Sequence, residues 1–189
     1  DRITGRKLTG SVLAFAGIPR GLETVSDAIA DPDCRARVED FWAEAVAGLP
    51  PGTEHEDYRT QLIARFANRR IVHSLSQIAA GATSKVQFRF AAVAERTLDA
   101  GRAPGASAEA TASWIQWLQT APSQSDPRAD ELAAAAASDD PVAALIARLS
   151  PRLAASEAFV ARVRDAAGPQ PNPRAHSVNA APPFSRRAS

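Results

Sequence analysis

The stretch YRTQLIARFANRRIVHSLSQIAAGATSK, residues Tyr58–Lys85, decides the fold of this chain. Its apolar residues recur every three or four positions, the period of a helix that packs one face against a core. Two such faces consist of Tyr58, Leu62, Ile63 and Phe66, and then of Ile71, Leu75 and Ile78. Thr53 and Glu56 form a capping-box pattern, so the sequence predicts a helix that opens there and runs through Phe66.

Helical signals continue on both sides of this stretch. An aspartate followed by proline, which places a capping carboxylate before a residue suited to the first helical position, occurs at residues 31–32, 126–127 and 140–141. Further apolar stripes are Phe90, Val93, Thr97 and Leu98; Trp114, Trp117 and Leu118; Val142, Leu145, Ile146 and Leu149; and Phe159, Val160 and Val163. No β-branched run of strand length is bounded by hairpin signals, so the predicted fold class is all-α.

The composition divides the chain into one helical domain, residues 1–167, and a tail, residues 168–189. The tail holds five of the 14 prolines together with Ser, Asn and Arg. Such a composition buries too little apolar surface to offset the entropy of ordering, so the tail is predicted to be disordered. It contains Arg174, Arg186 and Arg187 and no acid. Contact with an anionic surface and simple solvation are both compatible with it.

The overall counts exclude several classes of protein. The 22 Lys and Arg residues and 21 Asp and Glu residues give a net charge of +1, so neither nucleic acid nor a membrane surface is expected as a partner. No apolar run approaches the roughly 20 residues of a membrane span. A single cysteine excludes an internal disulfide framework and predicts a cytoplasmic protein. The absence of methionine, even at position 1, predicts a piece of a longer protein.

A few polar residues are candidates for chemistry. Lys7 and Lys85 are the only lysines, and a lysine, unlike an arginine, can lose its proton when buried. His73 is interpreted as a helical boundary histidine bonded to a carbonyl. No second histidine or acid stands near it at ligand spacing, so no metal site is expected. Cys34, in the first turn of a predicted helix, has either a lowered thiol pKa or a packing or surface role.

Three segments carry a resemblance to a known family. Gly21–Pro50, Tyr58–Lys85 and SDPRADELAAAAASDDPVAALIARL (residues 125–149) resemble the C-terminal helical domain of the mannitol dehydrogenase family of polyol dehydrogenases and fructuronate-type reductases. The similarity covers roughly residues 11–167. It implies NAD as cofactor, bound in the family by an N-terminal Rossmann-like domain. No G-x-G-x-x-G motif after a strand is present here, so the chain is not expected to hold NAD by itself.

The family's catalytic motif, K-L-R-L-L-N-G-S-H-S-A-L-A-Y, is altered in residues 1–12, which are atypical for the family. An alignment without gaps puts Arg2, Lys7 and Gly10 at the positions of the lysine, which acts as general base, the asparagine and the histidine. A short deletion instead keeps Lys7 as the catalytic lysine but still lacks the other two. Arginine cannot serve as a general base near neutral pH, so either alignment predicts a damaged site.

A second polar cluster matches the family better. Where the family often has D-G-S-x-K, this chain has Gly-Ala-Thr-Ser-Lys, ending at Lys85. The resemblance implies that Lys85 donates hydrogen bonds to substrate hydroxyls or a carboxylate, and that Gln77 occupies a position of substrate contact. The alternative is an ordinary exposed lysine and a glutamine that caps or bridges helices.

The resemblance implies the substrate-domain portion of an NAD-dependent oxidoreductase that acts on the CH–OH group of polyols or sugar acids. Its partners would be that substrate and a Rossmann-type domain, without which the chain is predicted to be inactive. A different class of function stays open, namely a degenerate helical interaction module that docks to a full-length dehydrogenase or another protein.

Overall fold

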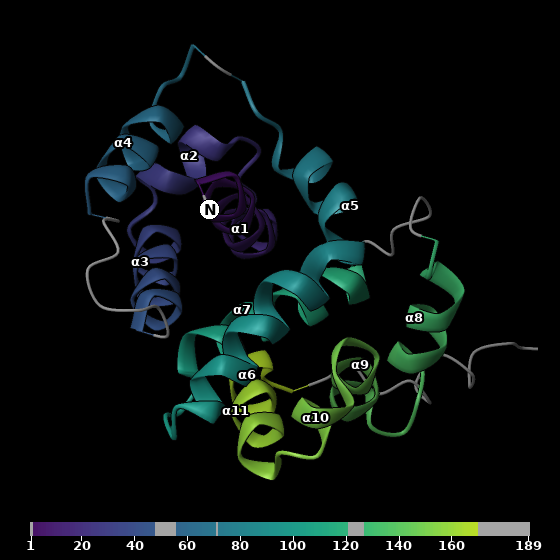
Figure 1. The fold of residues 1–189 in the computed structure, drawn as a ribbon. Helices are drawn as coiled ribbons and strands as arrows, with labels where there is room; N and C mark the ends of the chain where they lie inside the picture. Colours follow the sequence, from purple (N-terminus) through teal and green to yellow (C-terminus); the bar gives the residue numbers. More distant parts are fainter. Residues whose placement is uncertain (1, 48–55, 71, 121–126, 170–189) are drawn as a thin grey trace, which may run out of the picture.

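The computed structural model describes residues 2–47, 56–70, 72–120 and 127–169 (Figure 1). The helices are α1 (Arg2–Gly17), η1 (Ile18–Arg20), α2 (Val25–Ala30), α3 (Pro32–Ala47), α4 (Glu56–Phe66), α5 (Leu75–Val86), η2 (Gln87–Ala91), α6 (Ala92–Asp99), α7 (Gly105–Thr120), α8 (Ala129–Ala136), α9 (Pro141–Leu149), α10 (Pro151–Ala154) and α11 (Glu157–Ala167). Within the described ranges no strand occurs, and one isolated antiparallel bridge joins Thr24 and Ser74. The all-α prediction is confirmed.

Helix α1 lies at the centre of the packing. It contacts α2, α3, α5 and α7, and Figure 1 shows it between α2, α3 and α5. Leu13, Ala14 and Phe15 in its second half are fully buried. The sequence did not predict this helix, because small and hydroxylated residues interrupt its apolar stripe.

The buried hydroxyl groups of α1 are satisfied inside the helix. Thr9 Oγ1 donates to the carbonyl of Gly5 at 2.8 Å and accepts from the indole Nε1 of Trp42 at 2.7 Å. Ser11 Oγ donates to the carbonyl of Lys7 at 3.0 Å. Bonds to the carbonyl four residues earlier remove most of the cost of burying a hydroxyl group, so a polar helix can occupy the core.

Two of the three predicted Asp-Pro helix starts are confirmed. Helix α3 begins at Pro32 and α9 at Pro141. The preceding aspartate accepts a hydrogen bond from a first-turn amide in both, at 2.9 and 3.2 Å. The third start is displaced, because Pro127 lies in a turn and α8 begins at Ala129. Asp126 itself lies outside the described residues.

The second half of the domain packs α7 against α11, with α8, α9 and α10 completing the layer. The predicted apolar stripes at 114–118, 142–149 and 159–163 are buried. Glu44 on α3 caps α7, because its carboxylate accepts hydrogen bonds from the amides of Ala106 at 2.8 Å and Ser107 at 3.4 Å. This cap holds the second half against α3.

A π-helical turn, η2, separates α5 from α6 within one continuous helical run, residues 75–99. It directs Phe90 into the core, where the ring lies 6.1 Å from Phe15 and 5.4 Å from Phe41 between centroids. Phe88, two residues earlier, is 73% exposed. Such turns occur often at functional sites.

Several predictions fall outside the described residues, including the capping residue Thr53, Ile71, and residues 170–189 of the predicted tail. Helix α11 ends at Ala167. The domain boundary drawn there from the sequence stays a prediction.

The central position of α1 predicts that two phenylalanine-to-alanine substitutions will lower the free energy of unfolding by very different amounts. Phe15→Ala removes a fully buried ring that touches Phe90 and Trp117, and should lower the free energy of unfolding by about 3–5 kcal/mol. Phe88→Ala makes the same truncation at an exposed site and should change it by about 0.5 kcal/mol or less. Urea unfolding followed by far-ultraviolet circular dichroism measures both, and equal losses would contradict the central role of α1.

Candidate substrate pocket

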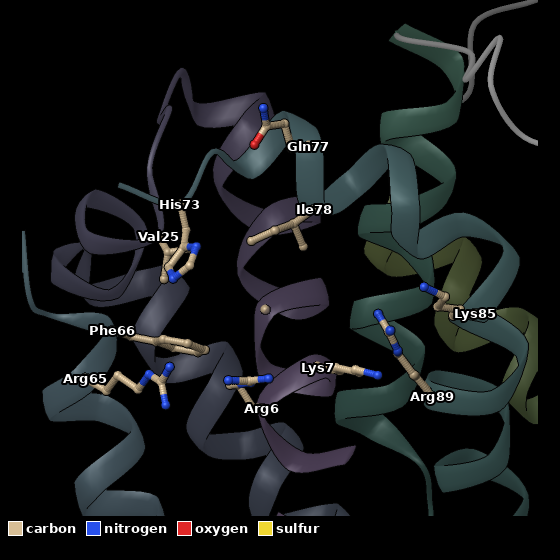
Figure 2. Close-up of a pocket in the computed structure, with 11 residues that line it drawn as sticks. Arg6, Lys7, Val25, Arg65, Phe66, His73, Gln77, Ile78, Lys85 and Arg89 are labelled. Atoms are coloured by element: carbon tan, nitrogen blue, oxygen red, sulfur yellow. The ribbon is translucent and has the colours of Figure 1, made fainter. Parts of the chain in front are cut away.

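A cavity of about 380 Å³ opens beside the first half of α1 (Figure 2). Its lining comes from α1, α2, α4, α5, η2 and the segment that precedes α5. Val25, Phe66 and Ile78 form the apolar part of its wall. A volume of this size accommodates a small organic ligand.

Helix α1 contributes Arg6, Lys7 and Gly10 to the cavity. Both alignments to the family motif involve residues of this set, and two of the altered positions, Lys7 and Gly10, line the cavity. A Cβ atom at position 10 would meet only Ile78, at 3.8 Å, so the absence of a side chain there leaves space in the pocket. The side chain of Arg2 lies outside what the structure describes.

Two backbone hydrogen bonds join the starts of α2 and α5. The amide of Val25 donates to the carbonyl of His73 at 3.0 Å, and the amide of Leu75 donates to the carbonyl of Glu23 at 2.9 Å. Thr24 and Ser74 are the N-caps of α2 and α5. Thr24 Oγ1 accepts a hydrogen bond from a first-turn amide of α2 at 3.2 Å, and Ser74 Oγ accepts one from a first-turn amide of α5 at 3.4 Å. This clasp places the beginning of α5 beside α2.

The clasp brings His73 and Gln77 to the rim of the cavity. His73 precedes α5, so the prediction that it lies on a helix is wrong. The reason is that Ser74 is the N-cap, so that α5 begins only at Leu75. Both side chains are exposed, and Figure 2 shows Gln77 above Ile78.

The end of α5 and the π-helical turn supply Lys85 and Arg89, four residues apart. Arg89 is half-buried and donates a hydrogen bond to Ser11 Oγ of α1. Burial lowers the pKa of its guanidinium group. Figure 2 shows the nitrogen ends of Lys7, Lys85 and Arg89 directed to a common space, with Arg6 and Arg65 beside Phe66.

The described side chains that line the cavity carry positive charges that no carboxylate neutralises. Among the described residues that line it, five are lysine or arginine and none is aspartate or glutamate. No ion pair joins any of the five to a carboxylate within the described part of the chain, although eight other arginines there form such pairs. Those arginines are Arg20, Arg35, Arg37, Arg59, Arg128, Arg148, Arg152 and Arg164. The cavity is therefore a local region of positive potential.

The structure brings all three residues expected from the sequence, Lys7, Gln77 and Lys85, into this one cavity. Sequence reasoning missed Arg6, Arg65 and Arg89. A weak signal existed for the last two, because each directly precedes a buried phenylalanine and so stands at the edge of the core.

Cys34 packs in the core instead of acting as a reactive thiol. It is fully buried, and burial, helped by a hydrogen bond to Asp31, raises its pKa to about 12. The lowered pKa considered from its place in the first turn is therefore wrong, because desolvation outweighs the helix N-terminus. Across residues 2–47, 56–70, 72–120 and 127–169, no three His, Cys, Asp or Glu side chains gather as metal ligands. The helices of these ranges include none long and apolar enough to cross a membrane.

Comparison with known sequences gives a consistent set of relatives. The family model described as the mannitol dehydrogenase C-terminal domain matches residues 8–168. A polyol:NADP oxidoreductase of Gluconobacter oxydans is 33% identical over 110 residues, which cover 57% of this chain and 23% of that protein. A mannitol-1-phosphate 5-dehydrogenase of Bacillus velezensis is 31% identical over 129 residues, which cover 65% of this chain and 32% of that protein. A D-mannonate oxidoreductase of Escherichia coli is 30% identical over 119 residues, which cover 60% of this chain and 24% of that protein.

Solved structures agree with these relatives. The mannitol 2-dehydrogenase of Pseudomonas fluorescens, in a ternary complex with NAD and D-mannitol, superimposes with a TM-score of 0.73 at 25% identity, over 86% of this chain and 37% of that one. A D-sorbitol dehydrogenase, with a TM-score of 0.63 at 21% identity, shares the fold over 86% of this chain and 40% of its own. The chain thus spans between 23% and 40% of the length of these proteins.

The raised pKa of Cys34 predicts an inert thiol in the folded protein. At pH 8 a thiol of pKa about 12 is ionised in about one molecule in ten thousand, so Ellman's reagent should react very slowly. Unfolding in urea returns the thiol to its ordinary pKa and should release one rapid equivalent. Rapid reaction of the folded protein at pH 8, before any loss of helical signal, would contradict the buried position.

Proposed function

The chain belongs to the mannitol dehydrogenase C-terminal domain family, and we propose that it is the substrate-domain portion of an NAD-dependent oxidoreductase acting on the CH–OH group of polyols or sugar acids. The observation that carries the proposal is the gathering of Lys7, Gln77 and Lys85 at one cavity. Lys7 comes from α1, whereas Gln77 and Lys85 come from α5, and the family resemblance assigns each of them to the substrate.

The proposed roles follow from the chemistry of the side chains. The ammonium group of Lys85 donates hydrogen bonds to hydroxyl groups or a carboxylate, and the amide of Gln77 both donates and accepts. Lys7 has two possible roles. As the family's lysine it would remove the hydroxyl proton, which requires the neutral amine. At the family's asparagine position it would instead stabilise the developing alkoxide as a cation.

The described residues do not fit NAD. They contain no strand, and a dinucleotide site of the Rossmann type needs a strand followed by a glycine-rich turn into a helix. The nicotinamide, which accepts or donates the hydride in such enzymes, would therefore come from a Rossmann-type domain in contact with this chain. One relative is named for NADP and one neighbour is complexed with NAD, so either nucleotide suits the proposal.

A second candidate function is the helical interaction module that docks to a full-length dehydrogenase. Two large apolar side chains near the ends of α5 favour it, since Val72 is 76% exposed and Phe88 is 73% exposed. Size-exclusion chromatography with an intact homologous dehydrogenase tests it. Co-elution that the double variant Val72→Ser and Phe88→Ser abolishes would support docking.

The proposal predicts binding without turnover for the chain alone. Isothermal titration calorimetry with D-mannitol and D-mannonate should detect one site, and Lys85→Gln or Gln77→Ala should weaken binding by roughly tenfold, since each removes a hydrogen bond to the ligand. Gln87→Ala, an exposed glutamine outside the cavity, is the matched control. With NAD or NADP added, absorbance at 340 nm should stay constant.

Two results would contradict this reading. Rapid production of NADH by the 189-residue chain alone would overturn its predicted inactivity. Failure to bind any polyol or sugar acid would overturn the assignment of the cavity as a substrate site.

A further inference from the structure

The unpaired positive charges of the cavity indicate the charge of the ligand that it binds. Elsewhere in the described chain, eight of the 13 arginines whose side chains are described lie in ion pairs with carboxylates, whereas none of the five cations of the cavity does. Like charges that share a site repel one another, and the repulsion grows where water is partly excluded. A ligand that brings negative charge relieves this repulsion.

Arg89 is the least solvated of the five cations, because its guanidinium group is half-buried and its hydrogen-bond partner, Ser11, is neutral. Burial of a cation without a counter-charge is unfavourable, and the lowered pKa of this group has the same cause. An anion in the cavity would offset the desolvation of Arg89. A neutral polyol would not.

The cationic donors line the cavity from opposite sides (Figure 2). Arg6 and Arg65 come from α1 and α4, Lys7 from the next position of α1, and Lys85 and Arg89 from the other side of the cavity. Arginine forks bind carboxylate or phosphate oxygens in pairs, and lysines act as point charges beside them. One carboxylate can be satisfied by one or two of these groups, which leaves the others unmatched.

The rest of the lining suits a short carbon chain with hydroxyl groups. Phe66, Ile78 and Val25 offer an apolar wall, and Gln77 offers an amide at the rim. The open space beside Gly10 adds room where the family's histidine would stand.

We infer that the cavity selects a polyhydroxylated dianion, namely a small sugar derivative that carries a phosphate or two carboxylates, over a neutral polyol. The inference rests on the proposed function, because it names the charge class of the substrate that the same cavity would take. The phosphate and the two carboxylates share the chemistry that five cations recognise.

Calorimetric titration of the full 189-residue chain with four ligands tests the inference. D-Mannitol is neutral, D-gluconate carries one charge, and D-glucarate and D-sorbitol 6-phosphate each carry two. At low salt at least one dianion should bind about tenfold or more tightly than D-mannitol, and its affinity should fall as sodium chloride is raised, because salt screens the attraction. The tighter of the two dianions identifies whether phosphate or paired carboxylates are preferred.

Charge-removing variants locate the effect. Arg6→Gln and Lys85→Gln, both at exposed positions of the cavity, should each weaken binding of the preferred dianion by about tenfold. Arg162→Gln removes the same charge from an exposed site on α11, which contributes nothing to the cavity, and should leave the affinity unchanged. Circular dichroism checks that all three variants fold.

The outcomes separate the two proposals. Equal affinity for D-mannitol and both dianions would overturn the inference and leave the proposed function standing. Inorganic phosphate binding as tightly as D-sorbitol 6-phosphate would also overturn it, because the site would then hold an adventitious ion only. Binding of none of the neutral or anionic sugar derivatives would overturn both.

Discussion

The burial of α1 among α2, α3, α5 and α7 is the packing constraint on which both the core and the cavity depend. Its second half supplies fully buried core residues such as Phe15, and its first half supplies three residues of the cavity lining. A helix with hydroxyl groups can take this position because Thr9 and Ser11 bond to carbonyls of the preceding turn. One wall of the cavity is consequently built on a helix that the core holds in place, and Arg6 and Lys7 project from it as exposed side chains.

The other walls of the cavity are set by two local devices in the backbone. The clasp between Val25 and His73, and between Glu23 and Leu75, fixes where α5 begins. The π-helical turn at its far end rotates the chain so that Phe90 enters the core while Arg89 faces α1. Together they explain how residues 73–89 form one side of a pocket although most of that segment is an ordinary amphipathic helix.

Charge pairing is common among the described arginines outside the cavity and absent from the cations that line it. Several of these pairs cross helix boundaries, as the one between Arg164 and Asp140 does at 2.7 Å. Pairs of this exposed kind stabilise the fold only slightly. The unpaired cations therefore matter more for what approaches the protein than for its stability, since a cluster of one sign in a partly enclosed site raises the local potential.

The sequence by itself determined the all-α fold, most helical faces and two helix starts, because these depend on local periodicity and capping chemistry. Through the family resemblance it also indicated Lys7, Gln77 and Lys85 as candidate catalytic or substrate-binding residues. Only the tertiary structure decided that α1 is central, that Cys34 is buried and that Arg6, Arg65 and Arg89 join the same cavity. The physical reason is that burial and proximity arise from contacts between segments far apart in the chain, and no local pattern records them.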